Sequence, residues 1–244
     1  MKKALILFSI FMSVNASALS VERSQKTLIK HGKGFYFTCK KQKQVKKYSI
    51  AAHEVLNKYK KDFIEKNIKK VVLCKKITFG LVDQYYPVGL YDPWSKIIYV
   101  KAENPKYFRD TLHHEVSSFI LRDYCKKTED DCKTFKAKWT RFNKAPYDKN
   151  WRKIPKDIYY WWNRGFISKY AMSNFENDFN TTVEFIITDR YRKKFIEKRH
   201  VFHDAHMQKF GMVDSMYKKY LTKNFYEKFQ EWKWKVLIYK IIKK

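Results

Sequence analysis

Apolar residues recur with two different periods along the chain. From Val45 to Ile64 they recur every three to four residues with lysines between them, and this spacing predicts one amphipathic helix with a buried face. The segments Val71 to Phe79 and Lys96 to Val100 are instead rich in β-branched and aromatic residues, and turn-forming residues separate them. These two segments predict a pair of strands.

A second helix is predicted directly after the second strand, because Glu103-Asn104-Pro105 interrupts the strand pattern. Its apolar residues follow the spacing i, i+4, i+7 and i+8 and should face the core; they are Leu112, Val116, Phe119 and Ile120. The remaining sequence is helical in tendency and contains no linker and no repeat. We therefore expect an α+β fold, a single mostly helical domain over residues 19–244 with a small antiparallel sheet before the second helix.

The first 18 residues have the pattern of a secretory signal peptide. Two lysines precede an apolar run from Ala4 to Val14, and small residues follow as far as Ala18. No later stretch approaches about 18 consecutive apolar residues, so we expect no transmembrane segment once the peptide is removed. The predicted protein is exported and either periplasmic or secreted. An uncleaved N-terminal anchor is the alternative.

Four cysteines follow the predicted signal peptide. An even number of cysteines in an exported chain is typical of disulfides, and four cysteines allow three pairings. The short spacing of Cys125 and Cys132 favours a local bridge between them, which leaves Cys39 to pair with Cys74. No two cysteines have CxxC spacing, so neither a redox motif nor a cysteine-built zinc site is expected.

The formal net charge of +29 indicates attraction to anions, such as nucleic acid, lipopolysaccharide or another anionic envelope component. Only nine of the 53 basic residues are arginine, however. Proteins that read phosphates and bases specifically rely on the bidentate arginine side chain. The abundance of lysine, isoleucine, asparagine, tyrosine and phenylalanine is also what AT-rich codons produce. We therefore expect no specific nucleic-acid partner.

The second predicted helix contains His114-Glu115, the first half of a zinc-protease motif. In the motif His-Glu-x-x-His, two imidazoles four residues apart bind one zinc ion, and the glutamate activates a metal-bound water. Here the position four residues after His114 is Ser118, and the position four residues after His113 is Ser117. A serine hydroxyl is a poor zinc ligand.

The order of strand, strand, His-Glu helix and a later helix with carboxylates resembles the HExxH zinc metallopeptidases of the gluzincin group. The segment from Tyr170 to Asn180 also resembles the Tyr-x-x-Thr-Asn-x-x-Glu-x-Phe-Ala-Glu segment of their lethal-factor-like branch. The resemblance implies a peptide or protein substrate bound beside an edge strand, with Glu115 as the base and Tyr170 assisting the transition state. It also implies a zinc cofactor bound by His114 and a carboxylate. The family's ligand glutamate is replaced here by Asn177.

Four further residues could restore the missing zinc ligands: His113, Glu176, Asp178 and Glu184. Structural roles compete with this interpretation. Ser173 and Glu176 have the spacing of a capping box, and Asp178 would be favoured in the first helical turn by the helix dipole.

Two functional hypotheses follow from these patterns. The first is an exported zinc-dependent peptidase, and the second is a non-catalytic basic protein that binds an anionic surface or polymer on the same scaffold.

Overall fold

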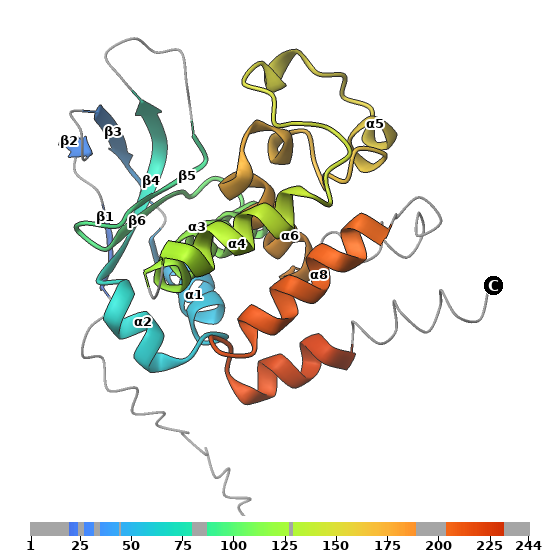
Figure 1. The fold of residues 1–244 in the computed structure, drawn as a ribbon. Coiled ribbons are helices and arrows are strands. Elements are labelled where there is room, and N and C mark those ends of the chain that lie inside the picture. Colours follow the sequence, from blue (N-terminus) through green and yellow to red (C-terminus); the bar gives the residue numbers. More distant parts are fainter. Residues whose placement is uncertain are drawn as a thin grey trace, which may run out of the picture.

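The computed structural model describes residues 20–23, 27–31, 35–43, 45–79, 87–126, 129–188 and 204–231. The predicted signal peptide lies outside this range. The described residues form a mixed sheet with helices packed against one of its faces (Figure 1). This arrangement confirms the predicted α+β class.

The sheet contains six strands, and its main order is β2-β3-β4-β6-β5, while β1 also pairs with β4. The strands are β1 (Ser20–Arg23), β2 (Thr27–His31), β3 (Phe35–Lys41), β4 (Lys70–Phe79), β5 (Gly89–Asp92) and β6 (Ile97–Lys101). The predicted pairing of the two central strands, β4 and β6, is confirmed, but the sheet is mixed and not purely antiparallel. β4 and β6 are parallel. The chain between them includes β5, which runs antiparallel beside β6 at the end of the order, so the chain has reversed twice when β6 begins and β6 runs in the direction of β4.

The helices and short 3₁₀ turns follow mainly after the sheet. They are α1 (Val45–Leu56), α2 (Lys61–Asn67), α3 (Pro105–Cys125), α4 (Glu129–Thr140), η1 (Trp151–Lys153), α5 (Ile158–Trp162), η2 (Tyr170–Ser173), α6 (Phe175–Ile187) and α8 (Asp204–Tyr217), and residues 223–231 are also helical. The single helix predicted from Val45 to Ile64 is therefore two helices. The chain breaks there because Lys60 N donates to Tyr220 O at 2.8 Å and Thr222 N donates to Lys58 O at 2.9 Å.

Helix α3 lies at the centre of the fold, between α1, α6 and the strands β5 and β6. Asn104 caps its N-terminus by accepting a hydrogen bond from Lys106 N at 2.9 Å, and Pro105 occupies the first turn, where its missing N–H costs nothing. The predicted core stripe is confirmed, since Leu112, Val116, Phe119 and Ile120 are all buried. Burial of this stripe against the sheet fixes the rotation of α3 and hence the direction of its polar side chains.

Two disulfides link neighbouring elements, and they confirm the predicted pairing. Cys39 in β3 is bonded to Cys74 in β4, and Cys125 at the end of α3 is bonded to Cys132 in α4. Among the described helices, none combines the length and the apolar character needed to cross a membrane.

Candidate functional site

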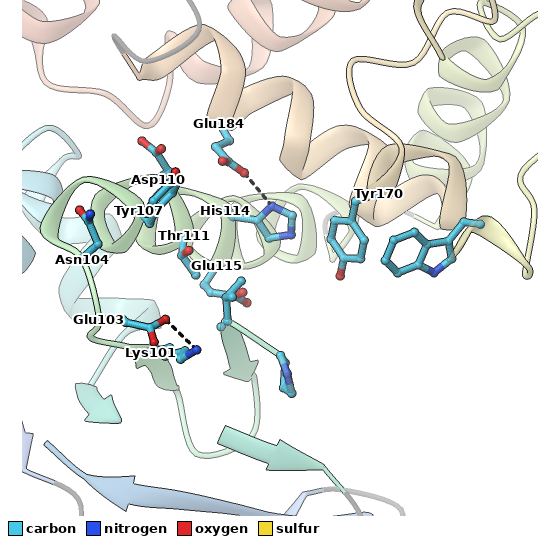
Figure 2. Close-up of a pocket in the computed structure, with 14 residues that line it drawn as sticks. Lys101, Glu103, Asn104, Tyr107, Asp110, Thr111, His114, Glu115, Tyr170 and Glu184 are labelled. Atoms are coloured by element: carbon cyan, nitrogen blue, oxygen red, sulfur yellow. Dashed lines mark ion pairs between the residues drawn. The ribbon is translucent and has the colours of Figure 1, made fainter. Parts of the chain in front are cut away.

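A cavity of about 470 Å³ lies beside α3 and opens between the start of β5, the end of β6, the two 3₁₀ turns and α6 (Figure 2). We call it the cleft. Its lining residues are Pro87, Val88, Gly89, Lys101, Glu103, Asn104, Tyr107, Asp110, Thr111, His114, Glu115, Trp151, Tyr170 and Glu184. The cleft thus brings together four of the residues expected from the sequence, namely His114, Glu115, Tyr170 and Glu184.

His114 forms an ion pair across the two central helices. Its Nδ1 lies 3.4 Å from Glu184 Oε2, and the two side chains are only 11% and 17% exposed. Figure 2 shows the imidazole between Glu184 and Tyr170, and the ring centres of His114 and Tyr170 are 5.8 Å apart. Burial alone would lower the pKa of His114, but the hydrogen bond to Glu184 and the charges of Glu115, Glu184 and Glu176 outweigh it and raise this pKa. His114 is therefore a cation more readily than an ordinary histidine.

Glu115, the next residue on α3, is a buried carboxyl group with only 7% of its surface exposed. Burial, together with the charges of Glu176 and Glu184, raises its pKa to about 7, although the charge of His114 opposes the change. A carboxyl group with this pKa can both give and take a proton near neutral pH. Its oxygen packs directly on Gly89, because a Cβ atom at that position would lie only 2.3 Å from Glu115 Oε1.

Strand β5 is the last strand in the order of the described sheet and forms one wall of the cleft. Lys101 N donates to Val88 O at 2.8 Å. This hydrogen bond shows which residues in and next to β5 direct their backbone groups toward β6. Because these groups alternate along an antiparallel pair, Gly89 and Tyr91 direct their N–H and C=O groups to the outer edge. The cleft therefore has a strand edge with backbone donors and acceptors directed away from the sheet.

Aromatic side chains form the remaining walls. Trp151 and Tyr170 meet edge to face, with ring centres 5.1 Å apart. Tyr107 and Val88 line the cleft and are 52% and 59% exposed. Large apolar groups at the rim of a cavity are typical of a binding site.

The position of the missing zinc-ligating histidine is filled by a hydrogen-bonded serine. Ser118 is buried, and its Oγ accepts a hydrogen bond from Asn180 Nδ2 in α6 at 2.6 Å. The Oγ of neighbouring Ser117 lies 2.8 Å from Asn180 Oδ1 and 2.6 Å from His114 O. These contacts join α3 to α6 through side chains that are poor metal ligands.

Asn177, at the second replaced ligand position, also forms local hydrogen bonds. Its Nδ2 donates to Ser173 Oγ at 2.8 Å, and its backbone N–H donates to Asn174 Oδ1 at 2.8 Å. Asn174 is therefore the N-cap of α6, and the capping box predicted for Ser173 and Glu176 is wrong. Ser173 belongs to η2, where its hydroxyl donates to Tyr170 O at 2.7 Å.

His113 lies away from the cleft, although it is adjacent to His114 in sequence. Its Nδ1 lies 2.7 Å from Tyr59 Oη and its Nε2 lies 3.2 Å from Lys58 Nζ. Burial and the charge of Lys58 hold the pKa of His113 well below its usual value. Successive helical residues differ by about 100 degrees in direction, so His113 faces the core when His114 faces the cleft. The prediction that it could join a metal site with His114 is not supported by its position.

Asp178 is likewise held elsewhere. Its two carboxylate oxygens lie 2.9 Å and 2.7 Å from Lys209 Nζ, and Trp139 Nε1 donates to Asp178 Oδ2 at 2.9 Å. Both charged side chains are fully buried. Asp178 thus stabilises the contact between α6 and α8 and does not reach the cleft.

Glu176 lies next to Tyr91 of β5 and is not among the residues that line the cleft. A hydrogen bond to Glu176 is one of the causes, after burial, that raise the pKa of Tyr91. The charge of Glu176 also raises the pKa values of His114 and Glu115. Glu176 therefore acts on the site electrostatically, from outside the lining of the cleft.

The residues of the cleft do not form the zinc site that the motif implies. His114 and Glu184 face each other, but the position of the second histidine is held by Ser118, which hydrogen-bonds to Asn180. In the part of the chain that the structure describes, no three histidine, cysteine or acidic side chains converge as a metal site requires. A standard three-ligand zinc centre does not fit these side chains.

Gly89, Trp151 and Asn180 shape the site and were among the residues not expected from the sequence. Gly89 matters only because Glu115 packs on it, and Trp151 only because η1 packs on η2. Asn180 carries a weak signal, since it follows Asn177 by three residues and so shares its helix face. Comparison of the chain with protein-family models, curated protein sequences and solved structures finds no match.

Proposed function

We propose that this protein binds an extended peptide segment in the cleft, on a scaffold similar to that of the zinc metallopeptidases but without their zinc centre. The observation that carries the proposal is an intact cleft beside two replaced metal-ligand positions, Ser118 and Asn177. Ser118 is buried and hydrogen-bonded to Asn180, while the residues that would hold a peptide remain in place.

The edge of β5 supports binding of the peptide main chain. A peptide in extended conformation can pair with the outward N–H and C=O groups of Gly89, at the start of β5, and so extend the sheet by one strand. This mode of binding depends on main-chain hydrogen bonds and accepts many sequences. Gly89 contributes because the absence of a side chain lets Glu115 approach the strand.

The polar centre of the cleft supports a hydrogen bond to the same peptide. With a pKa of about 7, Glu115 is divided between its two protonation states near neutral pH. The neutral carboxyl can donate to a peptide carbonyl, whereas the carboxylate can only accept. His114, held by Glu184, provides a second donor beside it. Binding through Glu115 should therefore depend on pH between about 6 and 8.

The first experiment measures peptide binding and cleavage together. Wild-type mature protein is incubated with extended peptides, binding is followed by tryptophan fluorescence, and products are analysed by mass spectrometry. Peptides N-methylated at one set of alternate amides should lose affinity, and those methylated at the other set should keep it, because only one set pairs with β5. We expect binding without cleavage.

Metal content provides the second readout. Wild-type protein incubated with zinc and then dialysed should retain much less than one zinc per chain. Ser118→His combined with Asn180→Gly restores the missing imidazole and provides space for it, and this variant should gain zinc. Stoichiometric zinc in the wild type, lost in His114→Ala, together with cleavage that Glu115→Gln abolishes, would replace our proposal with a zinc peptidase.

A further inference from the structure

A second hollow, of about 530 Å³, adjoins the cleft and is lined mainly by lysines. Its lining residues are Lys40, Lys75, Lys76, Ile77, Lys101 and Glu103, and we call it the lysine hollow. Lys101 and Glu103 line both the cleft and the lysine hollow. The two spaces therefore meet at this pair, whose charged atoms are 2.7 Å apart.

The strand register concentrates the positive charge. Lys40 of β3 and Lys76 of β4 are directly opposite each other in the antiparallel pair, where like charges destabilise a sheet. Lys41 is paired with Cys74, so Lys75 is the extra residue of a β-bulge. Bulges redirect side chains and are frequent beside functional sites.

The lysine hollow and the centre of the cleft differ in charge. The lining of the lysine hollow contains four lysines and one glutamate, and that glutamate is ion-paired with Lys101. The centre of the cleft contains Glu115 and Glu184 with the single imidazole of His114. An anionic group would therefore be repelled at the centre and attracted in the lysine hollow.

We infer that the lysine hollow is a subsite for acidic side chains of the peptide bound in the cleft. This inference rests on the proposed function. A peptide paired with β5 and crossing Lys101 and Glu103 would place neutral residues near Glu115 and aspartate or glutamate residues over Lys40 and Lys76. Lysine suits this task, because a mobile ammonium group accepts carboxylates in many orientations.

The test compares peptides that differ only in acidic residues. Extended peptides carry two glutamates at one end, two at the other end, or glutamine in both places, and affinity is measured by fluorescence at low ionic strength and at about 0.15 M salt. Glutamates at one end only should strengthen binding about three- to tenfold, the range expected for two exposed ion pairs, and salt should reduce the gain. Lys40→Gln/Lys76→Gln should abolish the preference.

A matched control separates the lysine hollow from the overall charge of the protein. Lys46 on α1 and Lys138 on α4 are both exposed, so Lys46→Gln/Lys138→Gln removes the same charge at other places and should keep the preference. Equal loss in both variants would assign the effect to the net charge and overturn the subsite. Peptide binding with no acidic preference would also overturn it, while the proposed function would stand.

Two further outcomes concern the proposed function itself. If no peptide binds, both the subsite and the peptide-binding function are wrong. An anionic polysaccharide, dextran sulfate, provides the comparison: if the wild type binds it, Lys40→Gln/Lys76→Gln does not, and no peptide binds, then the lysine hollow is a polymer site and the peptide subsite is refuted.

Discussion

Replacement of Glu115 by glutamine should stabilise the protein relative to the wild type, and this gain in stability should be larger at high pH than at low pH. The glutamine side chain has nearly the same shape but cannot ionise. The pKa of Glu115 rises from its ordinary value of 4.5 to about 7 in the folded protein, mainly through burial. A difference of this size corresponds to about 3 kcal/mol between the two protonation states.

The direction of the pH effect follows from proton linkage. Below pH 4.5 the carboxyl is protonated in both the folded and the unfolded states, so Glu115 does not weaken folding. As the pH rises from 4.5 to about 7, the unfolded chain loses this proton first and the folded state is progressively disfavoured. Above that range the wild type carries the full cost of about 3 kcal/mol, and Glu115→Gln does not.

The assay is urea unfolding at pH 4 and pH 8.5 with the disulfides intact. The stability difference between Glu115→Gln and wild type should shift by about 3 kcal/mol in favour of the variant at pH 8.5. Glu227→Gln, at an exposed position, is the control and should show no such shift. Because the charge of Glu115 also raises the pKa of His114, the comparison is repeated in a His114→Gln background. A difference that is the same at both pH values would refute the buried, proton-exchanging role of Glu115.

Three other predictions follow from the packing around the site. Lys209→Met should cost about 3–5 kcal/mol in urea unfolding, because Asp178 would be left charged and buried, and adding Asp178→Asn should recover part of that loss. Gly89→Ala should displace Glu115 and so weaken peptide binding at least tenfold in a fluorescence titration. Gly211→Ala is the control, because a Cβ at that position meets nothing within 4 Å. This variant should bind peptide normally and raise helix stability by about 0.5–1 kcal/mol. Removal of the β3–β4 disulfide, whose cysteines are 35 residues apart, should lower stability by about 4 kcal/mol, against about 2 kcal/mol for the α3–α4 disulfide with its separation of 7, as measured by thermal and urea unfolding.

The sequence predicts local structure well where one strong pattern is present. The stripe from Leu112 to Ile120 predicts α3 because four apolar residues on one helix face leave it a single way to pack. The pairing of β4 with β6 is also predicted from composition. The direction of that pairing is not, because parallel and antiparallel strands differ in the path of the connecting chain and have similar residues.

The candidate site was only partly predictable, because contacts with residues far away in the sequence decide which side chains face the cleft and which face the core. His113 and His114 are adjacent in the sequence, and the contact with Tyr59, 54 residues away, shows that His113 is the imidazole in the core. Lys209 has the composition of a surface residue in a chain with 53 basic residues, yet it is the buried partner of Asp178. Neither contact leaves a periodic pattern in the sequence.

In the metal-free scaffold that we propose, two side-chain contacts join α3 to α6. In a zinc site the metal cross-links the helices that supply its ligands and contributes to folding free energy. Here the His114–Glu184 ion pair and the Ser118–Asn180 hydrogen bond join the same two helices. Each contact is weaker than a metal bond, but each pairs buried polar groups that would be costly if left alone. A metal ion bound by His114 and Glu184 would take the place of their ion pair, whereas in the metal-free protein that we propose this pair stays intact and Glu115 is available to a bound peptide.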